Sequence, residues 1–113
     1  MSKITMHVLD TSLGKPASGV PVLLEFQSSK NWKELARSQT NMDGRVSQLL
    51  PESSKLEVGR YRITFDTGVY FKKNNTNGFY PYAQIVFEVL DPSQHYHIPL
   101  LLSPFGYSTY RGS

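Results

Sequence analysis

The amino-acid sequence predicts a mainly β protein, an antiparallel-rich β-sandwich with one short helix. Eight short runs alternate apolar and polar residues with a period of two, the pattern of strands that bury one face. Turn-forming residues recur roughly every ten positions, which is typical of a sandwich built from short strands. One segment has a helical composition, and it is only about two turns long. A chain of 113 residues is expected to form one domain, residues 1–113.

The first two predicted strands cover residues 3–10 and 20–27. In each, alternate apolar side chains form a core face: Ile4, Met6 and Val8, then Val20, Val22, Leu24 and Phe26. The outer face of the first strand is half apolar and carries His7 between Thr5 and Leu9. Pro21 is compatible with the second strand, because proline is tolerated at a first position or at a sheet edge.

The next two strands are predicted at residues 32–40 and 45–50, joined as a hairpin. Asp43-Gly44 lies between them and supplies the positive φ angles that a tight hairpin needs. Arg45 follows this turn directly, so a rigid element would fix the position of its side chain.

A strand at residues 59–66, a helix at residues 67–74 and a strand at residues 82–90 follow. Thr67 is a candidate N-cap of the helix, and Lys72 and Lys73 suit its C-terminal end. The last of these strands is expected to turn four apolar side chains inward: Ala83, Ile85, Phe87 and Val89.

The final pair of strands is predicted at residues 95–102 and 105–111, separated by Ser103-Pro104 and Gly106. One face of the first strand is an ordinary core face. The other carries four residues that are unusual for an exposed surface, so something is expected to cover it: His95, His97, Pro99 and Leu101. Pro99 predicts a bulge or a sheet edge at its position, because proline cannot donate to a ladder.

Composition excludes several classes of protein. The net charge of +3 favours an ordinary mixed-charge surface, with attraction of anionic ligands as the alternative. The absence of a Lys/Arg-rich run argues against nucleic acid as a partner. No apolar run approaches the ~18 residues of a membrane span, and no secretory signal follows Met1. There is no cysteine, which excludes disulfides and cysteine-based zinc sites.

Two histidines, His7 and His97, are the leading candidates for chemistry. A lone histidine on a strand is more often a packing or surface residue, but both of these lie on outer faces that also carry leucine. If their strands are neighbours, both imidazoles reach one site. We expect acid–base work or substrate hydrogen bonding and no metal, because no third ligand stands at metal spacing. His95, one step nearer the turn, is interpreted as a surface residue.

Arg45 and the last four residues have two interpretations each. Arg45 is either a solvated hairpin residue or a forked donor to an anionic or imide-like substrate, and Arg111 has the same alternatives. Ser113 would by default belong to a frayed terminus. We reject that interpretation because Tyr110 and Gly112 make little sense in a disordered tail. No Gly-x-Ser-x-Gly elbow supports a serine nucleophile.

The end of the chain resembles that of a known family. It runs Tyr-Arg-Gly-Ser at residues 110–113, and a His-x-Pro-Leu-Leu strand at residues 97–101 precedes it. In these features the chain is similar to the 5-hydroxyisourate hydrolases, the enzymatic branch of the transthyretin-like proteins. The resemblance covers the whole chain, since the Asp43-Gly44-Arg45 turn, the helix and Phe79-Tyr80-Pro81 have counterparts in the same order.

The resemblance implies a transthyretin-like sandwich of two four-stranded sheets. It also implies hydrolysis of 5-hydroxyisourate to 2-oxo-4-hydroxy-4-carboxy-5-ureidoimidazoline in urate degradation, by water attack on a cyclic amide bond and without a cofactor. Its catalytic residues would be His7, Arg45, His97 and Ser113, and its substrate-binding residues Arg45, Tyr110, Arg111 and Gly112.

Further implications concern assembly and location. The resemblance implies a homotetramer made of two dimers, with the pockets in the cleft between them. The expected compartment is the cytoplasm or the peroxisome, or the periplasm if a removed signal peptide preceded the chain. The alternative function is that of a transthyretin-like carrier of small aromatic ligands, but the hormone carriers lack this residue set and have a longer tail.

Overall fold

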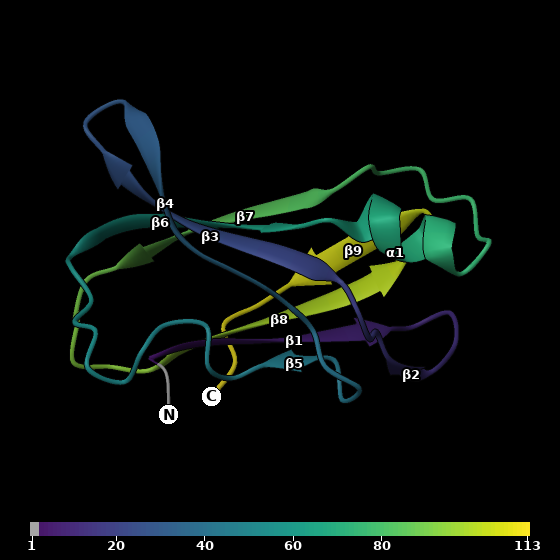
Figure 1. The fold of residues 1–113 in the computed structure, drawn as a ribbon, viewed down its shortest axis with the longest axis horizontal. Coiled ribbons are helices and arrows are strands. Elements are labelled where there is room, and N and C mark those ends of the chain that lie inside the picture. The colour runs from purple at the N-terminus through teal and green to yellow at the C-terminus, as the bar shows by residue number, and fades with distance from the viewer. Residues whose placement is uncertain (1–2) are drawn as a thin grey trace.

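The computed structural model describes residues 3–113 as two β-sheets packed face to face, with one short helix at one end of the sandwich (Figure 1). The elements in chain order are β1 (Ile4–Asp10), β2 (Lys15–Pro16), β3 (Pro21–Ser28), β4 (Asn31–Gln39), β5 (Arg45–Val46), β6 (Gly59–Phe65), α1 (Thr67–Lys73), β7 (Ala83–Val89), β8 (Tyr96–Ser103) and β9 (Gly106–Thr109). No helix in this described part of the chain has the length and hydrophobicity needed to cross a membrane.

One sheet has the order β2-β1-β8-β9, and the other has the order β4-β3-β6-β7. All strand pairs are antiparallel except β1 with β8, which run parallel in an unbroken register. The predicted sandwich is therefore confirmed. Its first sheet contains a fifth strand, because β5 also pairs with β1, and both β2 and β5 are only two residues long.

The core lies between the two sheets and consists of the inward residues that the sequence alternation predicts. Ile4, Met6 and Val8 of β1 are fully buried against Leu24 of β3 and Ile63 of β6. Because side chains on a strand alternate between faces, burying this set turns the intervening residues of β1 to the outside. Thr5 and His7 are thereby placed on the outer face of the first sheet.

The predicted hairpin of residues 32–40 with residues 45–50 is wrong. The tight turn is present, since Gly44 N donates to Asn41 O (2.9 Å) and Gly44 has a φ of 72°. However, β4 pairs with β3, while β5 crosses to the other sheet and pairs with β1. The edge of β1 explains the difference. β2 covers only two residues of that edge, and the turn satisfies more of it through Val8 N, which donates to Gly44 O (2.7 Å).

Pro99 lies in a central strand without the predicted bulge. Its register with β1 is regular. On the other side, the ladder with β9 ends at Leu100 opposite Thr109 and resumes in the same register at His97 opposite Gly112. Since proline has no N–H to donate, the gap falls at Pro99. The strand therefore keeps its central place, and the chain after β9 is free to bend across its outer face.

The N-cap of the helix lies one residue before the predicted Thr67. Asp66 is the N-cap and accepts a hydrogen bond from Val69 N (3.3 Å), whereas Thr67 is buried and donates to Tyr80 O (3.3 Å). The charged Asp66 side chain is the stronger partner for the positive end of the helix. Lys72 and Lys73 lie in the last turn as predicted.

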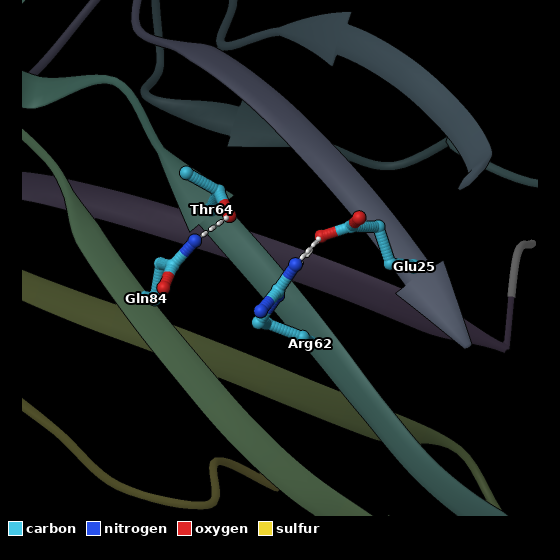
Figure 2. A network of polar contacts seen from close by, with 4 residues as sticks. All are labelled: Glu25, Arg62, Thr64 and Gln84. Carbon is cyan, nitrogen blue, oxygen red and sulfur yellow. Dashed lines mark hydrogen bonds and ion pairs between the residues drawn. The ribbon is translucent and has the colours of Figure 1, made fainter. Parts of the chain in front are cut away.

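The outer face of the second sheet is an ordinary polar face. Figure 2 shows Arg62 reaching Glu25 (Nε to Oε1, 2.9 Å) and Gln84 reaching Thr64 (3.1 Å), each across neighbouring strands. The guanidinium of Arg62 also lies 4.4 Å from the centre of the Trp32 ring. Such cross-strand pairs satisfy a solvated sheet face. The candidate catalytic histidines lie on the other sheet.

Candidate active site

A cavity of about 410 Å³ opens on the outer face of the first sheet, where β1, β5 and β8 lie side by side. β1 contributes Thr5, β5 contributes Arg45, and β8 contributes His97. The chain after β9 bends back so that Ser113 also reaches the cavity. The complete lining is Thr5, Met6, Arg45, Val46, Ser47, His95, His97 and Ser113.

Three of the four predicted catalytic residues, Arg45, His97 and Ser113, therefore line one cavity. His7 does not line it but lies beside it. In the strand register His7 is opposite Arg45 of β5 on one side and opposite Pro99 of β8 on the other. The parallel pairing of β1 with β8 brings together segments that are about ninety residues apart in the sequence.

His97 is held by the hydroxyl of Thr5. Thr5 Oγ1 lies 2.8 Å from His97 Nδ1 and 3.0 Å from Nε2 of His95. The two imidazole rings are nearly parallel, with an interplanar angle of 13° and centroids 6.4 Å apart. Because Nδ1 of His97 is engaged by Thr5, Nε2 is its ring nitrogen available to a ligand.

Burial lowers the pKa of His97 below its usual value of 6.5, and the positive charge of Arg45 lowers it further, as do His95 and His7. Burial and Arg45 also lower the pKa of His7, although a backbone hydrogen bond to Asp43 and the charge of Asp43 act in the opposite direction. Both imidazoles are therefore neutral at pH 7 and can accept a proton.

Gly112 fixes the course of the tail beside His97. Its N–H donates to the His97 carbonyl (2.8 Å), which closes an isolated bridge between the two residues. A Cβ at this position would lie 2.6 Å from His97 Cδ2 and 3.2 Å from Pro99 Cγ. Only glycine allows so close an approach, so Gly112 is the reason that Ser113 reaches the cavity.

The structure separates the other two residues of the tetrapeptide from this cavity. Tyr110 and Arg111 line a second cavity of about 250 Å³, which shares His97 with the first and extends to β7. The guanidinium of Arg111 lies 4.5 Å from the centre of the Tyr96 ring and donates to Gln94 Oε1 (2.9 Å). In this structure Arg111 anchors the tail to its own chain.

Sequence analysis missed three polar residues that line the first cavity: Thr5, Ser47 and His95. His95 is exposed, as interpreted, but it also bonds to Thr5. The alternation of His95 with His97 on one strand face was the available signal for His95. Thr5 offered none, because a threonine on a strand is ordinary.

The cavity combines groups suited to hydrolysis. A neutral imidazole can deprotonate a water molecule, and a nearby guanidinium stabilises the negative charge that develops on a carbonyl oxygen. Ser47 and Ser113 add hydroxyl groups at the wall. Within residues 3–113, no group of three or more His, Cys, Asp or Glu side chains is arranged to hold a metal ion.

Comparisons with known proteins identify the family of the chain. The HIUase/Transthyretin family matches residues 4–112. A probable 5-hydroxyisourate hydrolase of Caenorhabditis elegans is 46% identical over 112 residues, which cover 99% of this chain and 82% of the relative. The structure of Klebsiella pneumoniae 5-hydroxyisourate hydrolase has a TM-score of 0.85 and 38% identity, covering 97% of this chain and 98% of that one.

Sea bream transthyretin in complex with thyroxine superimposes with a TM-score of 0.91 at 30% identity, covering 98% of this chain and 95% of that one. The fold is thus shared by a hydrolase and by a transthyretin in complex with thyroxine, and the residues of the site must distinguish the two functions. On the evidence of the family match and these relatives, the chain belongs to the HIUase/Transthyretin family.

Proposed function

We propose that this protein hydrolyses 5-hydroxyisourate to 2-oxo-4-hydroxy-4-carboxy-5-ureidoimidazoline, a step of urate degradation. The observation that carries the proposal is the cavity in which Arg45 and the neutral imidazole of His97 meet. Relatives that are named for this reaction and match nearly the whole chain support the choice of substrate. A carrier of small aromatic ligands has no need of a proton acceptor beside a guanidinium.

In the proposed mechanism water is the nucleophile. His97 or His7 accepts a proton from this water molecule, since both have a lowered pKa and are neutral at pH 7. Arg45 binds the substrate and stabilises the oxyanion that forms when water attacks the cyclic amide carbon. Ser113 lines the same cavity, and its proposed role is to help position the water molecule.

The remaining residues of the tetrapeptide act by holding the tail. Gly112 lets the chain pass against His97, and Arg111 anchors it through Gln94 and the Tyr96 ring. Tyr110 and Arg111 line the neighbouring cavity, where they contact a substrate only if it extends past His97. Their proposed role is therefore mainly one of support.

The proposed assembly is a homotetramer of two dimers, with the pockets in the cleft between dimers. Its support is the outer face of β1 and β8, where Leu9 and Leu101 lie opposite each other and are both only half-buried. The tail covers Pro99 on this face but leaves these leucines in contact with water. A second copy would cover them while leaving the cavity open to substrate. The proposed compartment remains the cytoplasm or the peroxisome, or the periplasm if a removed signal peptide preceded the chain.

Ultraviolet spectroscopy of freshly generated 5-hydroxyisourate tests the function. The substrate decays spontaneously, and the enzyme should accelerate this decay in proportion to its concentration. A carrier would leave the decay rate unchanged. His97→Asn protein, folded to the same extent, is the matched control for adventitious catalysis by protein surfaces.

A further inference from the structure

The hydroxyl of Thr5 stands between two imidazoles on a rigid support. Its oxygen lies within hydrogen-bond distance of Nδ1 of His97 and Nε2 of His95, and the residue is 7% exposed. Thr5 and His97 are register partners in the parallel pair β1 and β8, so neither can shift without breaking the ladder. Hydrogen-bond contacts thus connect His97 through Thr5 to the exposed His95.

A hydroxyl has one proton, so it cannot donate to both rings at once. In one arrangement His97 Nδ1–H donates to Thr5, and Thr5 donates to Nε2 of His95. In the other arrangement both donations are reversed, which leaves the proton of a neutral His97 on Nε2. The first arrangement makes His97 Nε2 a proton acceptor, and the second makes it a donor. In these two arrangements the tautomers of the two histidines are coupled through Thr5.

We propose that Thr5 is a proton-relay residue that connects His97 in the cavity to His95 at its rim. This inference rests on the proposed hydrolysis. In the forward direction, His97 Nε2 takes a proton from the attacking water molecule. His97 Nδ1 passes its own proton to Thr5 Oγ1, the hydroxyl proton of Thr5 passes to His95 Nε2, and His95 Nδ1 releases one proton to solvent. Each side chain ends neutral, and one proton has left the cavity.

The proposed reaction needs such an exit. Hydrolysis of a cyclic amide to a carboxyl and a ureido group releases one proton near pH 7, because the carboxyl ionises and a ureido nitrogen does not take the proton up. The charged and titratable groups that face His97 make it unfavourable for this proton to stay on His97. These groups are Arg45 on β5, His7 on β1 and His95 just before β8. Movement toward exposed His95 takes the positive charge away from Arg45.

The test compares Thr5→Val with Thr5→Ser. Valine keeps the shape and removes the hydroxyl, while serine retains it. The first measurement needs no substrate: ¹⁵N NMR of histidine-labelled protein reports which ring nitrogen of His97 carries the proton. We expect Thr5→Val to change the tautomer ratio of His97 and Thr5→Ser to keep it. A ratio that is the same in Thr5→Val would overturn the coupling.

The second measurement is turnover. We expect Thr5→Val to lower kcat about tenfold or more with KM nearly unchanged, and Thr5→Ser to restore most of the rate. His95→Phe should lower kcat in dilute buffer and recover on addition of imidazole, to which the wild type is indifferent. Equal kcat for His95→Phe and wild type in dilute buffer would remove the relay. Failure of the proposed function can be told apart from failure of the relay. If the function is wrong, the wild type itself leaves the decay of 5-hydroxyisourate unchanged. The tautomer measurement still decides the coupling, because it needs no substrate.

Discussion

Arg45 carries a charge that adds to the effect of burial and lowers the pKa of the two histidines on the outer face of the first sheet. It lies opposite His7 in the strand register and shares a cavity with His97. Its side chain reaches this place because Gly44 turns the chain toward β1. A guanidinium keeps its charge over the whole working range of pH, so its effect on the imidazoles is permanent.

Removing this charge should raise both imidazole pKa values. In Arg45→Gln we expect the pKa of His7 and of His97 to rise toward 6.5, because a repulsive positive charge is lost. More of each imidazole is then protonated near pH 6, so the acid limb of any residual activity moves to higher pH. Proton NMR titration measures both values. Arg37→Gln, on the opposite sheet, is the control, and unchanged values in Arg45→Gln would contradict the electrostatic account.

His97 itself supplies the second prediction at this scale. His97→Asn keeps a hydrogen-bonding group near Thr5 but cannot act as a base near neutral pH. We expect turnover to fall on the order of a hundredfold or more, with the fold retained. His7→Asn and Arg45→Lys should have losses of similar size. Steady-state kinetics measures the turnover, and circular dichroism shows whether the fold is retained. Normal turnover in folded His97→Asn would remove this residue from the mechanism.

At the scale of elements, the tail after β9 depends on Gly112. An added methyl group meets His97 and Pro99, so Gly112→Ala should push residues 111–113 away from the cavity. We expect a large loss of kcat with little change in stability, and removal of residues 111–113 should act in the same way. Gly106→Ala is the matched control, since its new methyl group meets only Ser103 Oγ at 3.9 Å. Full activity of Gly112→Ala would separate the tail from catalysis.

The turn before β5 supplies a prediction about stability. In Gly44→Ala the new Cβ would collide with the carbonyl oxygen of Val8 and lie 3.0 Å from Pro16 Cβ. Gly14 has nearly the same φ, 68° against 72°, but open space around it. We expect Gly14→Ala to cost about 1 kcal/mol from backbone strain and Gly44→Ala at least about 1 kcal/mol more from crowding. Urea unfolding measures the free energy of unfolding of both variants. Equal losses of stability would show that β1 shifts to accommodate the added methyl group.

The limits of sequence analysis are also clearest at this scale. Alternation of Ile4, Met6 and Val8 identified a strand and its buried face, because the period of two is a local property. The destination of residues 45 and 46 was not a local property. It depended on the unpaired edge of β1, which no pattern near Asp43-Gly44 reveals.

The same reason separates the predicted part of the site from the missed part. His7 and His97 stood out because their outer strand faces also carry leucine, and Arg45 because it directly follows a tight turn. The resemblance to a known family pointed to the same three residues. Thr5 gained its role only from being opposite His97 in a parallel pair 92 residues apart in the sequence. A contact of this kind, between residues distant in the sequence, can be identified only once the pairing of the strands is known.

At the scale of the whole molecule, the outer face of β1 and β8 is the surface on which assembly can be tested. Leu101→Glu places a charge beside Leu9 on this face. We expect it to split the proposed tetramer and to abolish activity together, because burying an unpaired charge is costly. Leu35→Glu, on β4 of the other sheet, is the control and should change neither. Light scattering reads the mass, and a wild-type monomer with full activity at nanomolar concentration would contradict the shared interface.

The parallel pairing of β1 with β8 has a consequence for how activity is acquired. The cavity draws its walls from residues near 5, near 45 and beyond 95, so a chain that has formed only contacts between neighbouring segments has no complete site. Closing a loop of some ninety residues is slow relative to forming local turns. During refolding, catalysis should therefore return with the last kinetic phase and never ahead of it. Because of this topology, a partly folded chain would have no catalytic activity.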